Sequence, residues 1–114
     1  MTSASQAKGD RWERELAEHL RDRTGQPVHL LRPAGTLDVG DLNLATGAGY
    51  VAIEAKSAAR LELAGWCDEA CQEAANAGLP GWAVVIRRRG QRDPGQAYVV
   101  LTVTEWLRQT GAAT

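Results

Sequence analysis

Apolar side chains recur at about every fourth position near the start of the chain, a spacing typical of one face of an α-helix. They lie in a helix that we predict over residues 10–23: Trp12, Leu16, Ala17 and Leu20. Asp10 is the expected N-cap, and Glu13 three residues later would complete a capping box. Residues 1–7 are polar and are predicted to be a disordered N-terminus.

Three short runs of apolar and β-branched residues follow the first helix. They predict strands over residues 28–31, 37–44 and 50–57. A glycine-rich turn at 46–49 separates the last two strands. We therefore expect residues 39–56 to form a β-hairpin.

The second half of the chain alternates between helical and strand patterns. Residues 61–77 predict a helix, whose expected buried stripe consists of small and apolar residues: Leu63, Cys67, Ala70, Cys71 and Ala74. Strands are predicted over 82–86 and 97–103, with a basic loop at 87–95 between them, and Thr104 is the expected cap of a short final helix. The predicted order α-β-β-β-α-β-β-α favours an α/β fold, with a mixed β-sheet flanked by helices.

Composition indicates one globular domain, expected over residues 8–114. The chain has 114 residues, of which 44% are hydrophobic and 24% charged. No run of eighteen apolar residues predicts a membrane span, and the polar start lacks the apolar centre of a signal peptide, so we expect a cytoplasmic protein. Cys67 and Cys71 are interpreted as small apolar residues in a reduced core.

The strand at 50–57 carries both of its charges on one face. Because side chains alternate along a strand, Glu54 and Lys56 point to the same side, opposite to Val51 and Ile53. A solubilising ion pair is the simplest explanation. However, eleven of the thirteen cations are arginines, and lysine is a compact point charge for which arginine is not a substitute in a small site.

A second acid across the predicted hairpin points towards chemistry. Asp41 lies thirteen residues before Glu54, so the two carboxylates can meet at one end of neighbouring strands. Mg²⁺ prefers one or two carboxylates together with waters and phosphate oxygens. Such an ion polarises a phosphodiester and lowers the pKa of a bound water, and Lys56 would orient that water or stabilise developing negative charge. This pattern is typical of a metal-dependent nuclease.

Three blocks of the sequence, KGDRWERELAEHLR, RPAGTLDVGDLNL and VAIEAKS, resemble in order and spacing the motifs of the PD-(D/E)XK nuclease superfamily. The resemblance covers residues 8–107 and is greatest to small Holliday junction resolvases of the phage and actinobacterial type. It implies a restriction-endonuclease-like fold, Mg²⁺ or Mn²⁺ as cofactor, and a homodimer that places symmetric nicks in four-way or otherwise branched DNA.

The resemblance also implies roles at single positions. Asp41 and Glu54 match the metal-binding carboxylates, the main-chain carbonyl of Ala55 a further ligand, and Lys56 the catalytic lysine. Glu13 matches a helix acid that supports the site or a second ion, although the capping box explains this residue equally well. One departure is Gly40, which stands where the superfamily's name has proline.

Several arginines have two interpretations. They would ordinarily be solvated, but beside a nuclease site they become candidates to bind DNA phosphates: Arg87, Arg88, Arg89, Arg92 and Arg32. Gln72 and Glu73 are expected to face solvent on the second helix, with a smaller chance that Gln72 reaches the site. The net charge of −1 gives no support from overall basicity for nucleic-acid binding.

The sequence therefore predicts a divalent-metal-dependent endonuclease that hydrolyses DNA phosphodiesters, with a Holliday junction as the expected substrate. Two alternatives stay open at this point. One is a nuclease of the same fold that cuts flaps or duplex DNA. The other is a non-catalytic DNA-binding or assembly protein on the same scaffold.

Overall fold

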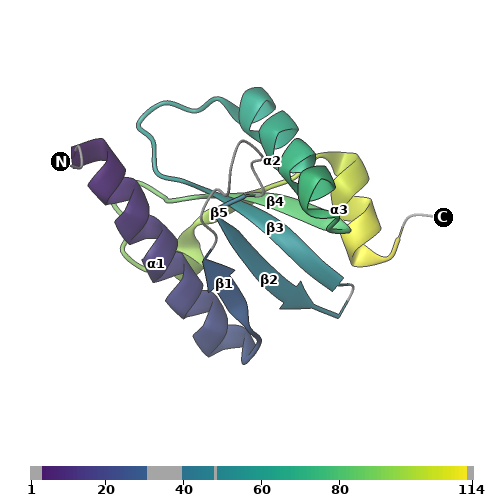
Figure 1. Ribbon diagram of the computed structural model, residues 1–114. Coiled ribbons are helices and arrows are strands. Elements are labelled where there is room, and N and C mark those ends of the chain that lie inside the picture. Colours follow the sequence, from purple (N-terminus) through teal and green to yellow (C-terminus); the bar gives the residue numbers. More distant parts are fainter. Residues whose placement is uncertain (1–3, 31–39, 48, 113–114) are drawn as a thin grey trace.

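A five-stranded sheet lies between helices in the computed structural model, which describes residues 4–30, 40–47 and 49–112 (Figure 1). The described elements follow one another along the chain as α1 (Ala4–Thr24), β1 (Val28–Leu30), β2 (Leu42–Thr46), β3 (Gly49–Lys56), α2 (Leu63–Ala77), β4 (Gly81–Ile86), a 3₁₀ turn η1 (Pro94–Gln96), β5 (Tyr98–Val100) and α3 (Val103–Thr110). The expected mixed α/β architecture is confirmed, whereas its nuclease type stays a prediction.

The sheet has the strand order β1-β2-β3-β4-β5. β1, β2 and β3 are antiparallel neighbours, and Leu42 pairs with Ile53 while Thr46 pairs with Gly49, so the described part of the predicted hairpin is confirmed. β3 and β4 run parallel because α2 carries the chain back across the sheet, as a parallel pair requires. β5 then returns antiparallel to β4.

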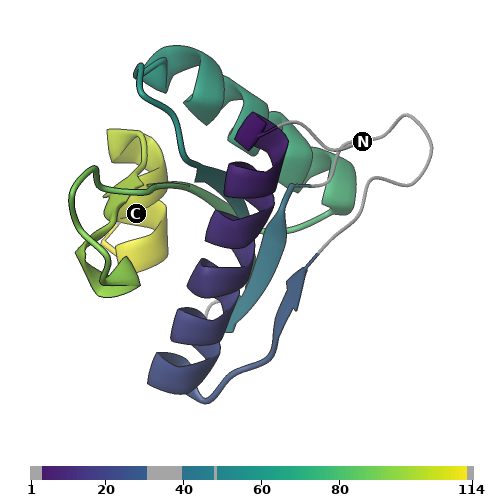
Figure 2. The same ribbon diagram turned by 90° about the vertical axis from the view of Figure 1, so that its left-hand side faces the viewer.

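Each face of the sheet is covered by a different helix. α1 packs on one face, where it lies in front of the strands in Figure 2, and its core consists of Trp12, Leu16, Ala17, Val28, Leu42, Val51, Ile53, Ala83 and Val85. α2 packs on the other face with Ala52, Trp66, Cys67, Ala70, Ala74, Trp82, Val84 and Ile86. Every residue of β4 is buried, as expected for a strand covered on both sides.

Several predicted helix boundaries were wrong. α1 begins at Ala4, because its upstream residues include good helix formers such as Ala7 and Lys8. Asp10 therefore lies inside the helix and is not an N-cap. The cap of α3 is Thr102 rather than Thr104, since Oγ1 of Thr102 accepts a 3.2 Å hydrogen bond from the Glu105 N–H.

The predicted buried stripe of α2 was also partly wrong. Leu63 and Cys71 are exposed, whereas Trp66 and Glu73 are buried. The stripe is therefore rotated towards Trp66, a residue whose large side chain gains more from burial than a cysteine does. Both cysteines are free thiols, as expected.

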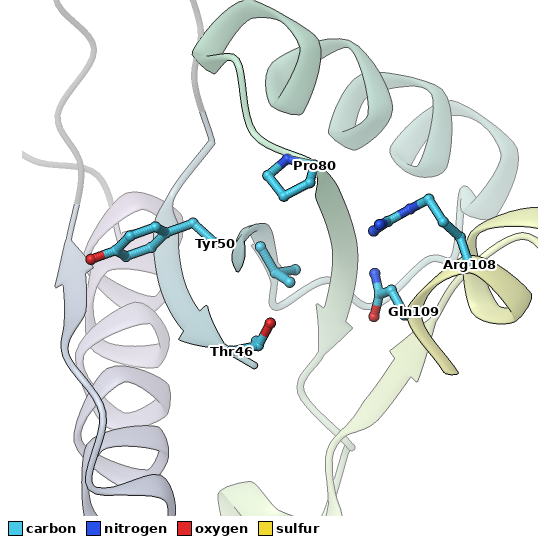
Figure 3. Close-up of a pocket in the computed structure, with 6 residues that line it drawn as sticks. Thr46, Tyr50, Pro80, Arg108 and Gln109 are labelled. Carbon is cyan, nitrogen blue, oxygen red and sulfur yellow. The ribbon is translucent and has the colours of Figure 1, made fainter. Parts of the chain in front are cut away.

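A buried carboxylate fastens α3 to the sheet. Glu105 accepts hydrogen bonds from the Trp82 N–H at 3.1 Å, from two Arg108 nitrogens at 2.8 and 2.7 Å, and from Gln109 at 2.6 Å. Burial opposes ionisation, but these hydrogen bonds outweigh it and lower the pKa of Glu105. Figure 3 shows Arg108 and Gln109 reaching from α3 towards β4, and together with Pro80 they line a cavity of about 190 Å³.

In the described part of the chain, none of the helices is both long and apolar enough to cross a bilayer.

Candidate metal and phosphodiester site

Asp41 is fixed to the strand that carries the other candidate residues. It lies immediately before β2, rather than within that strand, and its N–H donates a 3.1 Å hydrogen bond to the Ile53 carbonyl. Its Oδ2 accepts a 2.9 Å hydrogen bond from the Ala55 N–H. Two contacts to β3 thus hold the carboxyl group of Asp41 beside Glu54.

The carboxyl groups of Asp41 and Glu54 are close enough to hydrogen bond with each other. Burial and the nearby charges of Glu54 and Glu13 together raise the pKa of Asp41 to about 8, although the hydrogen bond from the Ala55 N–H opposes the shift. The structure therefore brings together the three predicted acids, Asp41, Glu54 and Glu13, at one end of the β2–β3 pair.

Lys56 lies on the same face of β3 as Glu54. Its Nζ is 3.2 Å from Oε1 of Glu54 and 3.5 Å from Oε1 of Glu69, and it lies 5.7 Å from the centre of the Trp66 ring. Although burial opposes the charged form, the two glutamates raise the pKa of Lys56. The side chain is thus held as an ammonium group beside the acids.

Glu73 is an acid of this region that sequence reasoning placed wrongly. Its side chain is buried at 2% exposure instead of facing solvent, and one ligand atom each of Glu54, Glu69 and Glu73 lie within 4.8 Å of one another. The spacing of residues on the helix could have indicated the position of Glu73. It follows Ala70 by three residues and Glu69 by four, so these three residues lie on one side of the helix. Gln72 is exposed and bonds to Asn76 instead.

Gly40 explains why proline is absent before Asp41. Its φ of +93° is outside the range of proline, which is locked near −65°. A Cβ at this position would also lie 3.4 Å from Oε2 of Glu73 and 3.6 Å from the Ile53 carbonyl oxygen. Glycine permits the backbone to approach both groups before it turns into β2.

The donor set of the site suits a hard divalent cation, which prefers carboxylate and carbonyl oxygens. An ionised carboxylate cannot donate a hydrogen bond. When Asp41 and Glu54 are both ionised, no described group therefore donates a hydrogen bond to Oε2 of Glu54, although that atom is buried. The N–H and C=O of one strand residue point to the same side, so the Ala55 carbonyl lies on the side of its N–H, towards Asp41. Asp41, Glu54 and Ala55 therefore fit the predicted ligand roles.

Basic side chains flank this end of the sheet. Arg87 follows β4, and its N–H donates a 2.9 Å hydrogen bond to the Lys56 carbonyl. Arg88, Arg89 and Arg92 are exposed, and the Arg88 guanidinium lies 5.5 Å from the centre of the Tyr98 ring. The remaining candidate, Arg32, lies outside the described residues.

Comparison with known proteins adds nothing to this geometry. The chain matches no protein-family model, and no curated protein matches it. The function must therefore be inferred from the residues of the site itself.

Proposed function

We propose that this protein is a divalent-metal-dependent endonuclease that hydrolyses DNA phosphodiesters, with branched four-way DNA as its preferred substrate. One observation carries the proposal: the Asp41 and Glu54 carboxyl groups meet, with the Lys56 ammonium 3.2 Å from Glu54. Two carboxyl groups and an ammonium group at the end of neighbouring strands suit metal-dependent hydrolysis of a phosphodiester, because they offer both a cation site and a hydrogen-bond donor for developing negative charge.

Each residue has a separate task in the proposed reaction. Asp41, Glu54 and the Ala55 carbonyl would hold Mg²⁺ or Mn²⁺, which when bound supplies Lewis-acid polarisation of the phosphodiester. Lys56 donates hydrogen bonds to phosphate oxygens and stabilises the negative charge that develops on them. Glu13 adds negative charge beside Asp41 and thereby favours a bound cation.

The arginines support DNA as the substrate. Arg87 is bonded through its backbone to Lys56, so the basic loop begins at the candidate site. Exposed arginines near a scissile phosphate neutralise the phosphates on either side of it. A four-way junction has near two-fold symmetry, and paired nicks on it call for a two-fold homodimer.

A cleavage assay tests the proposal and separates it from the alternatives. A four-way junction, a flap and a linear duplex of matched sequence are incubated with Mg²⁺ or Mn²⁺ and either wild-type protein or Asp41→Asn. We expect symmetric nicks in the junction with wild type and none with the variant. Equal cutting of all three DNAs would point to a nuclease of broader substrate range, and no cutting of any DNA would point to a binding protein.

A further inference from the structure

An apolar groove with a basic rim lies directly beside the candidate site. Its volume is about 320 Å³, and its lining includes Leu61, Leu63, Ile86 and Tyr98 together with the arginines at 87–89. This volume is at the lower end of the range for small-ligand pockets. Three of its apolar side chains are unusually exposed: Leu61 at 61%, Leu63 at 40% and Tyr98 at 52%.

The groove is on the same face of the sheet as the catalytic candidates. Lys56 pairs with Ile86 on β4, and Ile86 pairs with Tyr98 on β5. Residues directly opposite on neighbouring strands share a face, so these three side chains form one row across the sheet. Neighbouring strands are roughly 5 Å apart, which places Tyr98 two strand spacings from Lys56.

From this arrangement we infer that the groove binds an unpaired nucleobase next to the scissile phosphate. The inference rests on the proposed function and specifies its substrate as DNA in which a base can leave the helical stack. Tyr98 supplies an aromatic surface, and bases stack on aromatic rings and on arginine guanidinium groups regardless of sequence. Leu61 and Leu63 would cover the edges of the base.

Charge favours a nucleotide over a second protein copy as the occupant. Arg87, Arg88 and Arg89 line the groove, and they complement the phosphates attached to an inserted base. A two-fold dimer formed through this surface would bring two copies of the same positively charged segment into one interface, where like charges are unfavourable.

Two duplexes of equal length and charge test the inference. Both contain one 2-aminopurine, which is paired with thymine in the first and opposite an abasic site in the second. Binding is measured with EDTA, so that no strand is cut. We expect wild type to bind the unpaired probe about 5- to 100-fold more tightly than the paired one, as stacking of a single base predicts, with quenching of the probe's fluorescence.

Variants of β5 provide matched controls. Tyr98→Ala should lose the preference for the unpaired base, while Tyr98→Phe should keep it because the ring remains. Val99→Ala should also keep it, because Val99 is 62% exposed but pairs with Val85 and so lies on the opposite face. Thermal unfolding of each variant checks that the fold is intact.

The inference is overturned if wild type binds both duplexes equally, or if Tyr98→Ala and Val99→Ala reduce binding alike. It is also overturned if Leu61→Ser dissociates a dimer in sedimentation experiments, since the groove would then be covered by another copy.

These outcomes are independent of catalysis. Cleavage with Mg²⁺ but no preference for unpaired bases would contradict the inference alone, and a preference without cleavage would contradict the proposed nuclease activity alone.

Discussion

The Ala55 N–H donates a 2.9 Å hydrogen bond to Oδ2 of Asp41, and so β3 holds in place an acid that precedes the neighbouring strand. The same β3 segment carries Glu54 and Lys56. Three functional candidates therefore depend on the register of one strand pair, in which Leu42 lies opposite Ile53. A slip of one residue would turn Glu54 and Lys56 to the opposite face.

The first prediction concerns stability without metal. Asp41 keeps its proton in the folded state up to about pH 8, whereas in the unfolded chain it ionises near 3.8. The folded state binds more protons between these values, so the contribution of Asp41 to stability falls as pH rises through this range and is constant above it. In EDTA at pH 8, Asp41→Asn should therefore be about 1–2 kcal/mol more stable than wild type.

Urea unfolding at pH 5, 6, 7, 8 and 9 measures this effect. The stability difference between Asp41→Asn and wild type should grow with pH up to about 8 and then level off. A difference that does not depend on pH would contradict the raised pKa of Asp41.

The second prediction concerns cation binding. A cation that binds only the folded state stabilises it by mass action, so millimolar Mg²⁺ or Mn²⁺ should raise the melting temperature of wild type. Asp41→Asn and Glu54→Gln should lose this increase. Asp68→Asn is the matched control, since it removes the same charge from an exposed position on α2 and should respond like wild type. An equal response of all four proteins would exclude the proposed ligands.

The sequence was sufficient to predict the parts of the site that follow from strand geometry. Alternation placed Glu54 and Lys56 on one face, and the hairpin brought Asp41 to Glu54. These relations are local, because a strand has a fixed period of two and a hairpin pairs neighbours in sequence. The mixed sheet with helices followed for the same reason.

The contribution of α2 could not be predicted in this way. Glu73 is buried beside Gly40 because of how α2 packs across the sheet, and a polar residue next to an apolar stripe usually faces water.

The start of α1 was misplaced for a different reason. Asp10 has the residue type of an N-cap, but residue type alone does not stop a helix that continues upstream to Ala4.

The third prediction separates cation binding from charge stabilisation. Lys56→Met should lower the single-turnover rate of DNA cleavage by about 10²- to 10³-fold, the usual cost of losing one donor to a developing charge. The increase in melting temperature with Mg²⁺ should persist, because the carboxylates remain. Lys56→Arg should not restore the rate, since its planar fork does not replace a point charge. Restoration by arginine would show that any cation suffices.

The fourth prediction concerns the basic loop. Each phosphate contact contributes a slope of about −0.9 to the dependence of log K on log salt concentration. Arg89→Ala should therefore reduce the magnitude of this slope by about 1 for any DNA sequence, as measured by fluorescence anisotropy between 50 and 200 mM salt. Arg23→Ala removes an exposed arginine at the far end of α1 and should leave the slope unchanged. Equal effects of the two variants would mean that the loop makes no specific phosphate contact.

The last prediction concerns Glu105, which anchors α3 to the sheet but takes no part in the proposed cation site. Glu105→Gln keeps the size of the side chain but removes the charge that Arg108 neutralises, so it should lower the free energy of unfolding by about 2 kcal/mol at pH 7. Because the folded state lowers the pKa of Glu105 from 4.5, its contribution is present above that value and is lost as pH falls through the lowered pKa. Urea unfolding between pH 3 and 7 should therefore show the variant and wild type converging in acid. The Mg²⁺-dependent increase in melting temperature should remain in Glu105→Gln, because α3 contributes no ligand to the proposed cation site. Loss of that increase would show that the anchoring of α3 also positions Asp41 and Glu54.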